Sequence, residues 1–281
     1  MKVIAFVNMK GGVGKTTLAV NVAHALAKRH HKRVLIIDVD PQFNATQCLF
    51  SGDDYVAKRE EGGHTIFDLF NDGAIPVISP VSGTSEKSPP EIEDIEAWSY
   101  GPRLDILPGN LEIYRLDMVP GSGRELRLKR YMESLAGNDA YDYVVIDTPP
   151  TPSTFMTSAI LASDYYLIPV RPEPLSRVGI DLLTGVIGRI IKNHGHKIVN
   201  VGVVLTMMDA RTSVYYEALS FLDSDPKWSG KRFKTVLPQR TKIAKNQGDQ
   251  RLILDSGQED AMRAVAGITN ELLERVDDDG L

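Results

Sequence analysis

The sequence predicts an α/β fold in which helices cover both faces of a mostly parallel, twisted sheet. Short apolar runs of strand length alternate along the chain with longer segments of helical periodicity. Several of the apolar runs end on an aspartate or on a glycine-rich turn, as buried parallel strands do when they bring polar groups to one edge of a sheet. We therefore expect a single α/β domain over residues 1–281.

The expected elements follow one another in a regular order. Residues 3–7 form a first strand, and residues 15–29 form a helix because their apolar residues recur on one face. The next strand, residues 33–40, ends on carboxylates. Further strands are expected over 141–150, 164–170 and 200–209, and a closing helix over 259–275. Ligands collect beyond the carboxyl ends of parallel strands, so the residues that follow these strands are the first candidates for a site.

Residues 76–97 interrupt this order. The segment is rich in proline, serine and acidic residues and has weak periodicity, which favours an exposed insertion over a core element. A contact with a partner is one interpretation of the insertion. A tolerated surface loop is the simpler one.

The composition narrows the class of protein. Hydrophobic residues make up 42% of the chain and charged residues 25%, a balance that supports a sizeable core. The formal net charge of −5 means that binding to nucleic acid requires a local basic patch. Cys48 is the only cysteine, which excludes an internal disulfide and a cysteine-built metal site within one chain. Because the apolar runs are too short to span a membrane and the chain starts on a strand, we expect a cytoplasmic protein with no membrane partner.

A glycine-rich turn lies between the first strand and the first helix. Glycines let consecutive backbone N–H groups curl around a phosphate, and the following helix adds its positive N-terminus. Lys15 is expected to pair with the β- and γ-phosphates of a nucleotide, and the Thr16 hydroxyl to join the shell of a Mg²⁺ ion. The predicted nucleotide-binding residues of this turn are Gly11, Gly12, Val13, Gly14, Lys15, Thr16 and Thr17.

Three aspartates at strand ends are candidates for the chemistry. Asp147 ends an apolar strand and is expected to anchor the Mg²⁺ ion together with Thr16. Asp38 and Asp40 are one residue apart, so they point to opposite faces of the strand unless the strand bends. We favour Asp40 as the residue that orients and polarises an attacking water, with Asp38 nearer the metal. Either aspartate could instead cap the turn that Pro41 favours.

The turn carries a second lysine, Lys10, at its mouth, although Lys15 alone suffices to bind a nucleotide. With this lysine pair the chain closely resembles the ParA/Soj family of partition ATPases, which are P-loop NTPases of the deviant Walker A type. The resemblance extends over nearly the whole chain outside residues 76–97. The motifs that carry it are KGGVGKTT (10–17), IDVDPQFNAT (37–46) and VVIDTPP (144–150).

The resemblance implies a Mg²⁺-dependent ATP hydrolase that is slow alone. In this family two subunits close face to face with ATP between them, and the lysine that matches Lys10 reaches the phosphates bound by the other subunit. A cation there neutralises charge that grows in the transition state. Lys10, Lys15 and Asp40 are therefore the expected catalytic residues. Pro238 aligns with the segment that packs on the adenine, and Met207 is expected among the nucleotide-binding residues, so the resemblance implies ATP rather than GTP.

The resemblance also implies that the ATP-bound homodimer binds DNA without sequence preference. A ParB-like centromere-binding partner would release the dimer by stimulating hydrolysis, and the ATP-bound form would associate with the nucleoid. Arg211 and Lys242 match basic residues that contact DNA, and Arg240 lies close by. For each of them an ordinary solvated charge is the competing interpretation. Family members of this size lack an extra N-terminal DNA-reading domain, and we expect the same of this chain.

Proteins with the same fold have other functions, and the sequence bears on each of them. A MinD-like, membrane-associated regulator needs a basic amphipathic helix at its C-terminus, whereas this chain ends ELLERVDDDGL. An ATPase that positions a protein cargo is the other alternative. An iron protein of this class needs two cysteines from each subunit, which Cys48 alone does not supply. A metabolic ligase or kinase would need an acceptor site, and none is legible in the sequence.

Overall fold

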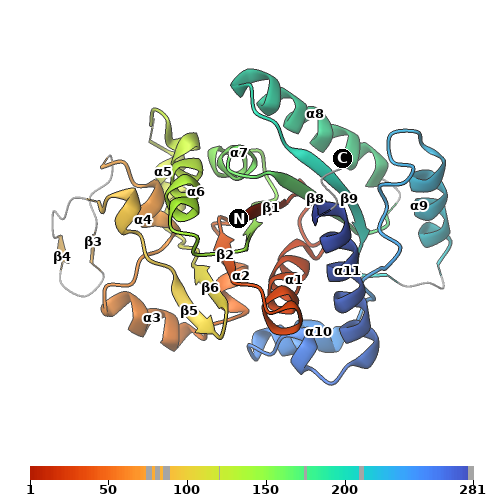
Figure 1. The fold of residues 1–281 in the computed structure, drawn as a ribbon, viewed down its shortest axis with the longest axis horizontal. Coiled ribbons are helices and arrows are strands. Elements are labelled where there is room, and N and C mark those ends of the chain that lie inside the picture. Colours follow the sequence, from red (N-terminus) through yellow and green to blue (C-terminus); the bar gives the residue numbers. More distant parts are fainter. Residues whose placement is uncertain are drawn as a thin grey trace.

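The computed structural model describes residues 1–73, 78–79, 83–84, 89–119, 121–173, 176–208 and 212–277. Within these ranges a seven-stranded sheet has the order β5-β6-β2-β7-β1-β8-β9, in which β5 runs antiparallel to β6 and the other neighbours are parallel (Figure 1). This arrangement confirms the predicted α/β domain. The strands are β1 (Lys2–Phe6), β2 (Val34–Asp38), β5 (Trp98–Gly101), β6 (Leu104–Leu107), β7 (Tyr143–Asp147), β8 (Tyr165–Val170) and β9 (Val199–Leu205), and β3 (Ile78–Ser79) pairs separately with β4 (Gly83–Thr84).

Helices fill the connections between these strands. The longest are α1 (Lys15–His30), α8 (Ser176–His194) and α11 (Glu259–Asp277). The shorter ones are α2 (Asn44–Gln47), α3 (Gly52–Glu60), α4 (Ile66–Phe70), α5 (Ile113–Asp117), α6 (Arg127–Gly137), α7 (Thr154–Leu161), α9 (Ser213–Ser224) and α10 (Thr241–Gly248), with 3₁₀ turns η1 (Ile92–Asp94), η2 (Arg124–Leu126) and η3 (Ile253–Asp255).

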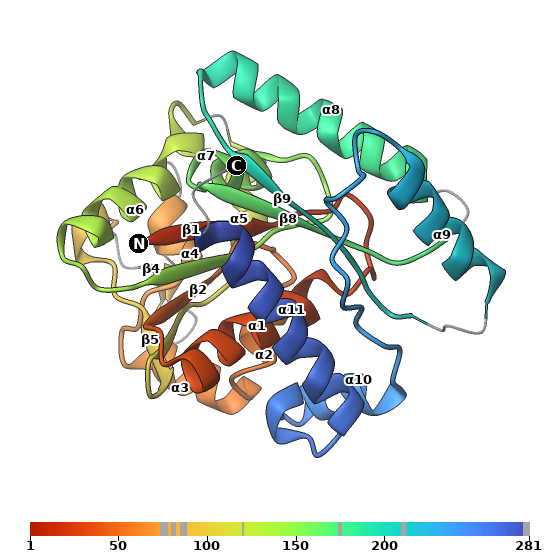
Figure 2. The ribbon, with the colours of Figure 1, turned by 45° about the vertical axis from the view of Figure 1, so that its right-hand side comes forward.

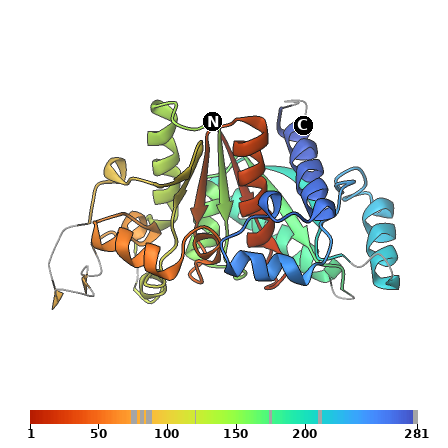
Figure 3. The ribbon, with the colours of Figure 1, turned by 90° about the horizontal axis from the view of Figure 1, so that it is seen from below.

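The sheet is buried on both faces. Successive residues of β1 point to opposite sides: Val3 and Ala5 join one hydrophobic cluster, and Ile4 and Phe6 join the other. Helices α1 and α11 cover the second cluster, whereas α6, α7 and α8 cover the first (Figures 2 and 3). Strands covered in this way carry apolar residues on both faces, which is why they form nearly continuous apolar runs in the sequence.

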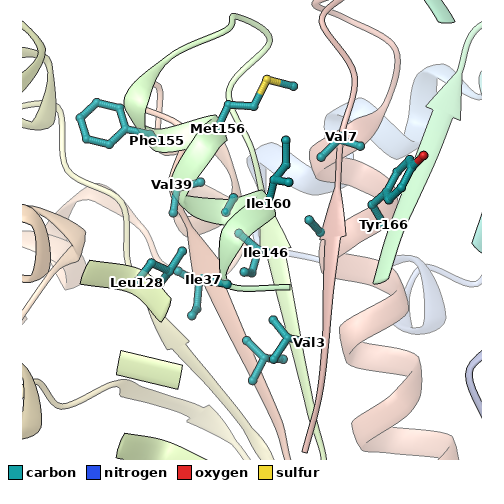
Figure 4. Packing of buried hydrophobic residues seen from close by; sticks show 14 of the residues in the cluster. Val3, Val7, Ile37, Val39, Leu128, Ile146, Phe155, Met156, Ile160 and Tyr166 are labelled. Carbon is teal, nitrogen blue, oxygen red and sulfur yellow. The ribbon is translucent and has the colours of Figure 1, made fainter. Parts of the chain in front are cut away.

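Close packing on the first face comes largely from α7. Phe155, Met156 and Ile160 are fully buried and lie over Ile37 and Ile146 of the sheet (Figure 4). Burying an aliphatic or aromatic side chain of this size contributes about 1.5–3 kcal/mol. This layer therefore fixes the position of the carboxyl ends of β2 and β7, which carry the predicted metal ligands Asp38 and Asp147 and precede the predicted catalytic residue Asp40.

The predicted elements have the correct type, and their ends differ by a few residues. Strand β2 stops at Asp38, earlier than the predicted end at residue 40, and β9 stops at Leu205 rather than at residue 209. The edge hairpin β5–β6 was not expected from the sequence. Strand β5 is four residues long and half exposed, so it shows neither a continuous apolar run nor a long alternation.

The predicted exposed insertion, residues 76–97, lies partly outside the described residues. In its last part Glu91, Glu93, Asp94 and Glu96 are exposed, whereas Ile92 and Ile95 belong to the hydrophobic core. The hydroxyl of Tyr131 donates a hydrogen bond to the Ile95 carbonyl at 3.3 Å. The two buried residues were not expected from the sequence, because two isolated isoleucines among acidic residues give no periodicity to read.

Candidate nucleotide site

The predicted site residues converge at the carboxyl edge of the sheet. A cavity of about 840 Å³ opens there, and the turn between β1 and α1 forms one wall of it. Gly12 and Gly14 of this turn have φ angles of 71° and 77°, in the left-handed region that favours glycine. The described residues that line the cavity are Gly11, Gly12, Val13, Gly14, Lys15, Thr16, Thr17, Asp40, Gln42, Phe43, Asn44, Thr46, Gln47, Cys48, Phe50, Ser51, Gly52, Tyr55, Val56, Pro150, Met207, Gln247, Gly248 and Gln250.

Lys15 and Thr16 begin helix α1 and face the buried carboxylates. Lys15 is only 6% exposed. Burial raises the pKa of both Asp40 and Asp147, and the nearby Lys15 ammonium offsets part of that rise. Thr16 Oγ1 donates a hydrogen bond to Asp147 Oδ2 at 2.6 Å. The structure thus brings together one lysine, one hydroxyl and two of the three predicted aspartates.

Asp38 and Asp147 lie opposite each other in register on β2 and β7. Both are fully buried. Thr46 donates to Asp38 Oδ2 through its backbone N–H and its hydroxyl, each at 2.8 Å. Among the described residues, Oδ1 of each aspartate is buried without a hydrogen-bond partner. Burial raises the pKa of Asp147 to about 6, and burial beside Asp147 raises the pKa of Asp38 well above its usual value. The Thr16 hydroxyl and two carboxylates that each keep an unpartnered oxygen are ligand types that suit a divalent cation.

Asp40 follows the end of β2 and, unlike Asp38, lines the cavity. Its Oδ1 accepts a hydrogen bond from the Gln42 backbone N–H at 2.9 Å, so the turn-capping interpretation is correct for this oxygen. Asp40 is 5% exposed, and burial raises the pKa of its carboxyl. Strand β2 ends at Asp38, so Asp40 no longer follows the alternation of the strand. Asp40 therefore reaches the cavity, whereas Asp38 is fully buried and does not line it.

Lys10 is not among the described residues that line the cavity. Its Nζ forms an ion pair with Glu173, which follows β8. Its backbone N–H donates to Asn8 Oδ1 at 2.9 Å, and Asn8 Nδ2 donates to the Pro169 carbonyl at 2.6 Å. The second lysine therefore lies on the β8 side of the turn, outside the cavity of its own chain.

An aromatic wall of the cavity was not anticipated from the sequence. Phe43, Phe50 and Tyr55 line it, and the rings of Phe43 and Tyr55 stack with their centroids 5.6 Å apart. Phe43 has a φ of 40° and packs against Gly109, where an added Cβ would lie 2.4 Å from the Phe43 Cβ. The signal available was the aromatic residue within DPQFNAT, whose side-chain direction depends on this left-handed turn.

The far wall comes from late segments of the chain. Of the two late residues predicted to bind the nucleotide, Met207 lines the cavity. Pro238 pairs with Met208 in a short parallel bridge and is not among the described lining residues. Gln247 of α10 was not predicted. Its Nε2 donates to Thr17 Oγ1 at 3.0 Å and contacts Cys48 Sγ at 3.5 Å. Residues 230 positions apart thus join α10 to the first turn of α1.

The predicted DNA contacts differ in their surroundings. Arg211 lies outside the described residues. Arg240 precedes α10 and forms an ion pair with Asp260 of α11. Lys242 and Lys245 are both exposed, three residues apart on α10. Within the ranges described, none of the helices is apolar over enough length to cross a bilayer.

Sequence comparisons identify relatives over most of the chain. Residues 1–200 match the family model described as an AAA domain. The sporulation initiation inhibitor protein Soj of Bacillus subtilis is 32% identical over 245 residues, with 86% of each chain covered. The chromosome partitioning protein ParA of Caulobacter vibrioides is 30% identical over 246 residues, covering 87% of this chain and 83% of the relative. The cell division protein PomZ of Myxococcus xanthus is 29% identical over 250 residues, covering 88% and 69%.

Solved structures show the same fold. A putative plasmid partition protein of Borrelia burgdorferi bound to AMPPNP superposes with a TM-score of 0.76 at 20% identity, covering 98% of this chain and 99% of that one. Cobyrinic acid a,c-diamide synthase of Mycobacterium smegmatis, solved with an ATP analogue and magnesium, gives 0.70 at 22% identity, covering 99% and 96%. Together with the matches to Soj and ParA, the paired lysines and the strand-end aspartates place the chain in the ParA/Soj family of P-loop ATPases.

Proposed function

We propose that this chain is an ATP-dependent, dimer-forming ATPase of DNA partition, acting on a plasmid or a chromosome. A relative and a protein of the same fold carry names of this kind, the chromosome partitioning protein ParA of Caulobacter vibrioides and the putative plasmid partition protein of Borrelia burgdorferi. The observation that carries the proposal is the position of Lys10, whose side chain is 44% exposed and does not line the cavity, although the adjacent Gly11 does. A lysine there is available to a nucleotide held by a second copy of the chain.

The phosphate-binding part of the proposal rests on the turn of residues 11–17. Its backbone N–H groups and the N-terminus of α1 would hold the phosphates, with Lys15 on the β- and γ-phosphates. Within the described ranges, no three His, Cys, Asp or Glu side chains gather to hold a metal ion. Mg²⁺ commonly takes one or two carboxylates and completes its shell with phosphate oxygens and water. Thr16, Asp147 and Asp38 would serve it here, and bound Mg²⁺ would neutralise phosphate charge.

Asp40 would orient the attacking water. It lines the cavity, and one of its oxygens is fixed by the Gln42 backbone N–H. Its other oxygen would accept a hydrogen bond from the water and hold it in line with the γ-phosphate. Lys15 of the same chain and Lys10 of the partner would neutralise the charge that grows on the phosphoryl oxygens.

DNA would be bound by the ATP-bound dimer through its basic residues. Arg211, Arg240 and Lys242 are the proposed contacts, and dimerisation would double their number. Each phosphate that they neutralise makes binding more sensitive to salt. Hydrolysis, stimulated by a ParB-like partner, would then separate the dimer and release the DNA, so that only the ATP-bound form associates with the nucleoid.

A second candidate is an ATPase that positions a protein cargo. The similarity to the cell division protein PomZ supports it, because a relative over 88% of this chain carries a name that refers to a process other than DNA partition. Both candidates share the ATP-dependent dimer and differ in the partner. Deleting the gene would cause loss of the inherited plasmid or chromosome if the chain partitions DNA, and would leave inheritance intact if the cargo is a protein.

The central test compares two variants by gel filtration and DNA binding in the presence of ATP. Lys10→Ala should abolish the ATP-dependent dimer, because it removes the cation offered to the partner's phosphates. Asp40→Ala should instead accumulate a dimer that hydrolyses poorly and stays on DNA. A Lys10→Ala chain that dimerises like the wild type would overturn the proposal.

A further inference from the structure

One carboxylate holds two cations beyond the end of β8. Glu173 pairs through Oε2 with Lys10 Nζ, and its Oε1 lies 3.4 Å from Arg171 Nε. The three side chains are partly exposed, at 34% for Glu173, 44% for Lys10 and 42% for Arg171. The group is therefore accessible to a second molecule, and Lys10 directly precedes Gly11, which lines the cavity.

Lys10 is tied to this segment at both ends. Its backbone N–H donates to Asn8 Oδ1, and the amide of Asn8 donates in turn to the Pro169 carbonyl of β8. Its ammonium is paired with Glu173, which lies four residues after Pro169 in the chain. A surface lysine usually samples many rotamers, whereas this one has its backbone and its charge fixed to the same neighbouring strand.

The strand order shows on which side of β1 the Lys10–Glu173 ion pair lies. Strand β1 lies between β7 and β8, and β2 lies beyond β7. Asp38 and Asp147 end the strands on one side of β1, whereas Glu173 follows the strand on the other side. Glu173 therefore draws the Lys10 ammonium away from the carboxylates and the cavity of its own chain.

We propose that Glu173 is a positioning residue that retains the Lys10 ammonium in the monomer and releases it when the nucleotide-bound dimer closes. This inference rests on the proposed function, in which Lys10 binds phosphates held by the partner. A terminal phosphate carries more negative charge than one carboxylate, so it can take the ammonium from Glu173. Arg171 then remains beside Glu173 and keeps that carboxylate paired.

The size of the effect follows from the number of pairs that break. An exposed ion pair contributes a factor of about two to five to an equilibrium. Closing a symmetric dimer breaks one pair in each protomer, so Glu173 should raise the dimer dissociation constant about 4- to 25-fold. Glu173 would thus set the protein concentration at which the ATP-bound dimers form.

The first test measures dimerisation of Glu173→Gln by analytical ultracentrifugation with AMPPNP. The substitution keeps the shape of the side chain and removes its charge, so the dissociation constant of the dimer should fall about 4- to 25-fold. ATP hydrolysis per assembled dimer should stay unchanged. Glu259→Gln is the matched control, since Glu259 is an exposed glutamate paired with Arg263 on α11. Thermal unfolding of both variants should match the wild type.

The second test examines the pair without a dimer. Lysine amines of the nucleotide-free monomer are acetylated with a limiting amount of an N-hydroxysuccinimide ester and quantified by mass spectrometry. Lys10 should react faster in Glu173→Gln than in the wild type, because its amine is no longer covered by the carboxylate. Lys245, exposed on α10, should react equally in both.

The outcomes separate the two proposals. A wild-type chain that forms no dimer with AMPPNP at any soluble concentration would overturn the proposed function and the release step with it, and the labelling would still decide whether Glu173 holds Lys10. A wild type that dimerises, with Glu173→Gln dimerising no more tightly, would overturn this inference alone. Equal labelling of Lys10 in both chains would also overturn it.

Discussion

Around Asp147 the charged and polar groups are buried and tied to specific neighbours, whereas on α10 the cations face solvent. Asp147 accepts from Thr16 and lies opposite Asp38 in the sheet, and both aspartates are fully buried. Lys242 and Lys245 are exposed on α10, on the opposite side of the molecule from α8 (Figure 2). The two regions carry opposite charge and have opposite exposure.

This difference determines how each region responds to a substitution. In a buried site the effective dielectric constant is low, so removing one group disturbs every partner that it held. On an exposed helix, water and salt screen each charge, so single cations contribute little and add independently. We therefore expect large, specific effects at the carboxyl edge and small, salt-dependent effects on α10.

The largest effect is expected for Asp40→Asn. The amide preserves the shape of the side chain and can still accept from the Gln42 backbone N–H, but it is a poor acceptor for the proton of an attacking water. ATP hydrolysis should fall about 10²- to 10⁴-fold, the range typical of general-base residues. Binding of AMPPNP, measured by calorimetry, should change little.

An exposed aspartate provides the control for this substitution. Asp223→Asn removes a carboxylate that pairs with Arg232 at 2.8 Å, more than half exposed and unconnected with the cavity. Its hydrolysis rate should equal that of the wild type. If Asp40→Asn hydrolysed ATP at the wild-type rate, Asp40 would not be the residue that activates the attacking water.

The sequence predicts the parts of the site that lie in short local motifs and misses those that depend on residues far apart in the chain. The turn of residues 11–17 and the aspartates at strand ends have short local patterns, so the sequence alone indicates them as candidates. Gln247 was missed because its partner, Thr17, lies 230 positions away and no local pattern marks an amide that crosses between helices. Glu173 was missed for a similar reason, since its pairing with Lys10 depends on β1 lying beside β8.

Asp147→Asn should have opposite effects on the empty and the loaded protein. In the nucleotide-free chain the variant removes a buried negative charge that faces Asp38, so the Tm should rise by about 2–4 °C. With nucleotide the same charge is needed behind Mg²⁺, so affinity for Mg²⁺·AMPPNP should fall about 10- to 100-fold.

Calorimetry and thermal unfolding on one preparation measure both effects. Repeating the titration with EDTA isolates the metal-dependent part, since AMPPNP without Mg²⁺ should bind wild type and variant alike. A variant that loses stability without nucleotide would show that the carboxylate is stabilised by its hydrogen bond with Thr16 more than it is penalised by burial.

A smaller effect is expected for Gln247→Ala. Its amide donates to Thr17 at 3.0 Å and is half-buried at the edge of the cavity. One neutral hydrogen bond contributes about 0.5–1.5 kcal/mol, so affinity for AMPPNP should fall roughly 2- to 10-fold. Gln239→Ala, at an exposed glutamine before α10, should leave the affinity unchanged. Equal affinities in all three chains would show that α10 does not support the first turn of α1.

The smallest effect is expected for Lys242→Ala, and salt distinguishes it from the others. Each phosphate contact contributes about 0.9 to the slope of log K against log salt, so a dimer that loses two contacts should show a slope smaller by about two. At moderate salt, DNA affinity should fall only a few-fold and equally for different sequences. Lys192→Ala, at an exposed lysine on α8, is the matched control and should keep the wild-type slope. An unchanged slope for Lys242→Ala would show that Lys242 on α10 does not contact DNA.

The weakened Mg²⁺·AMPPNP binding of Asp147→Asn should persist at high salt, because the Asp147 carboxylate is fully buried and salt screens it little.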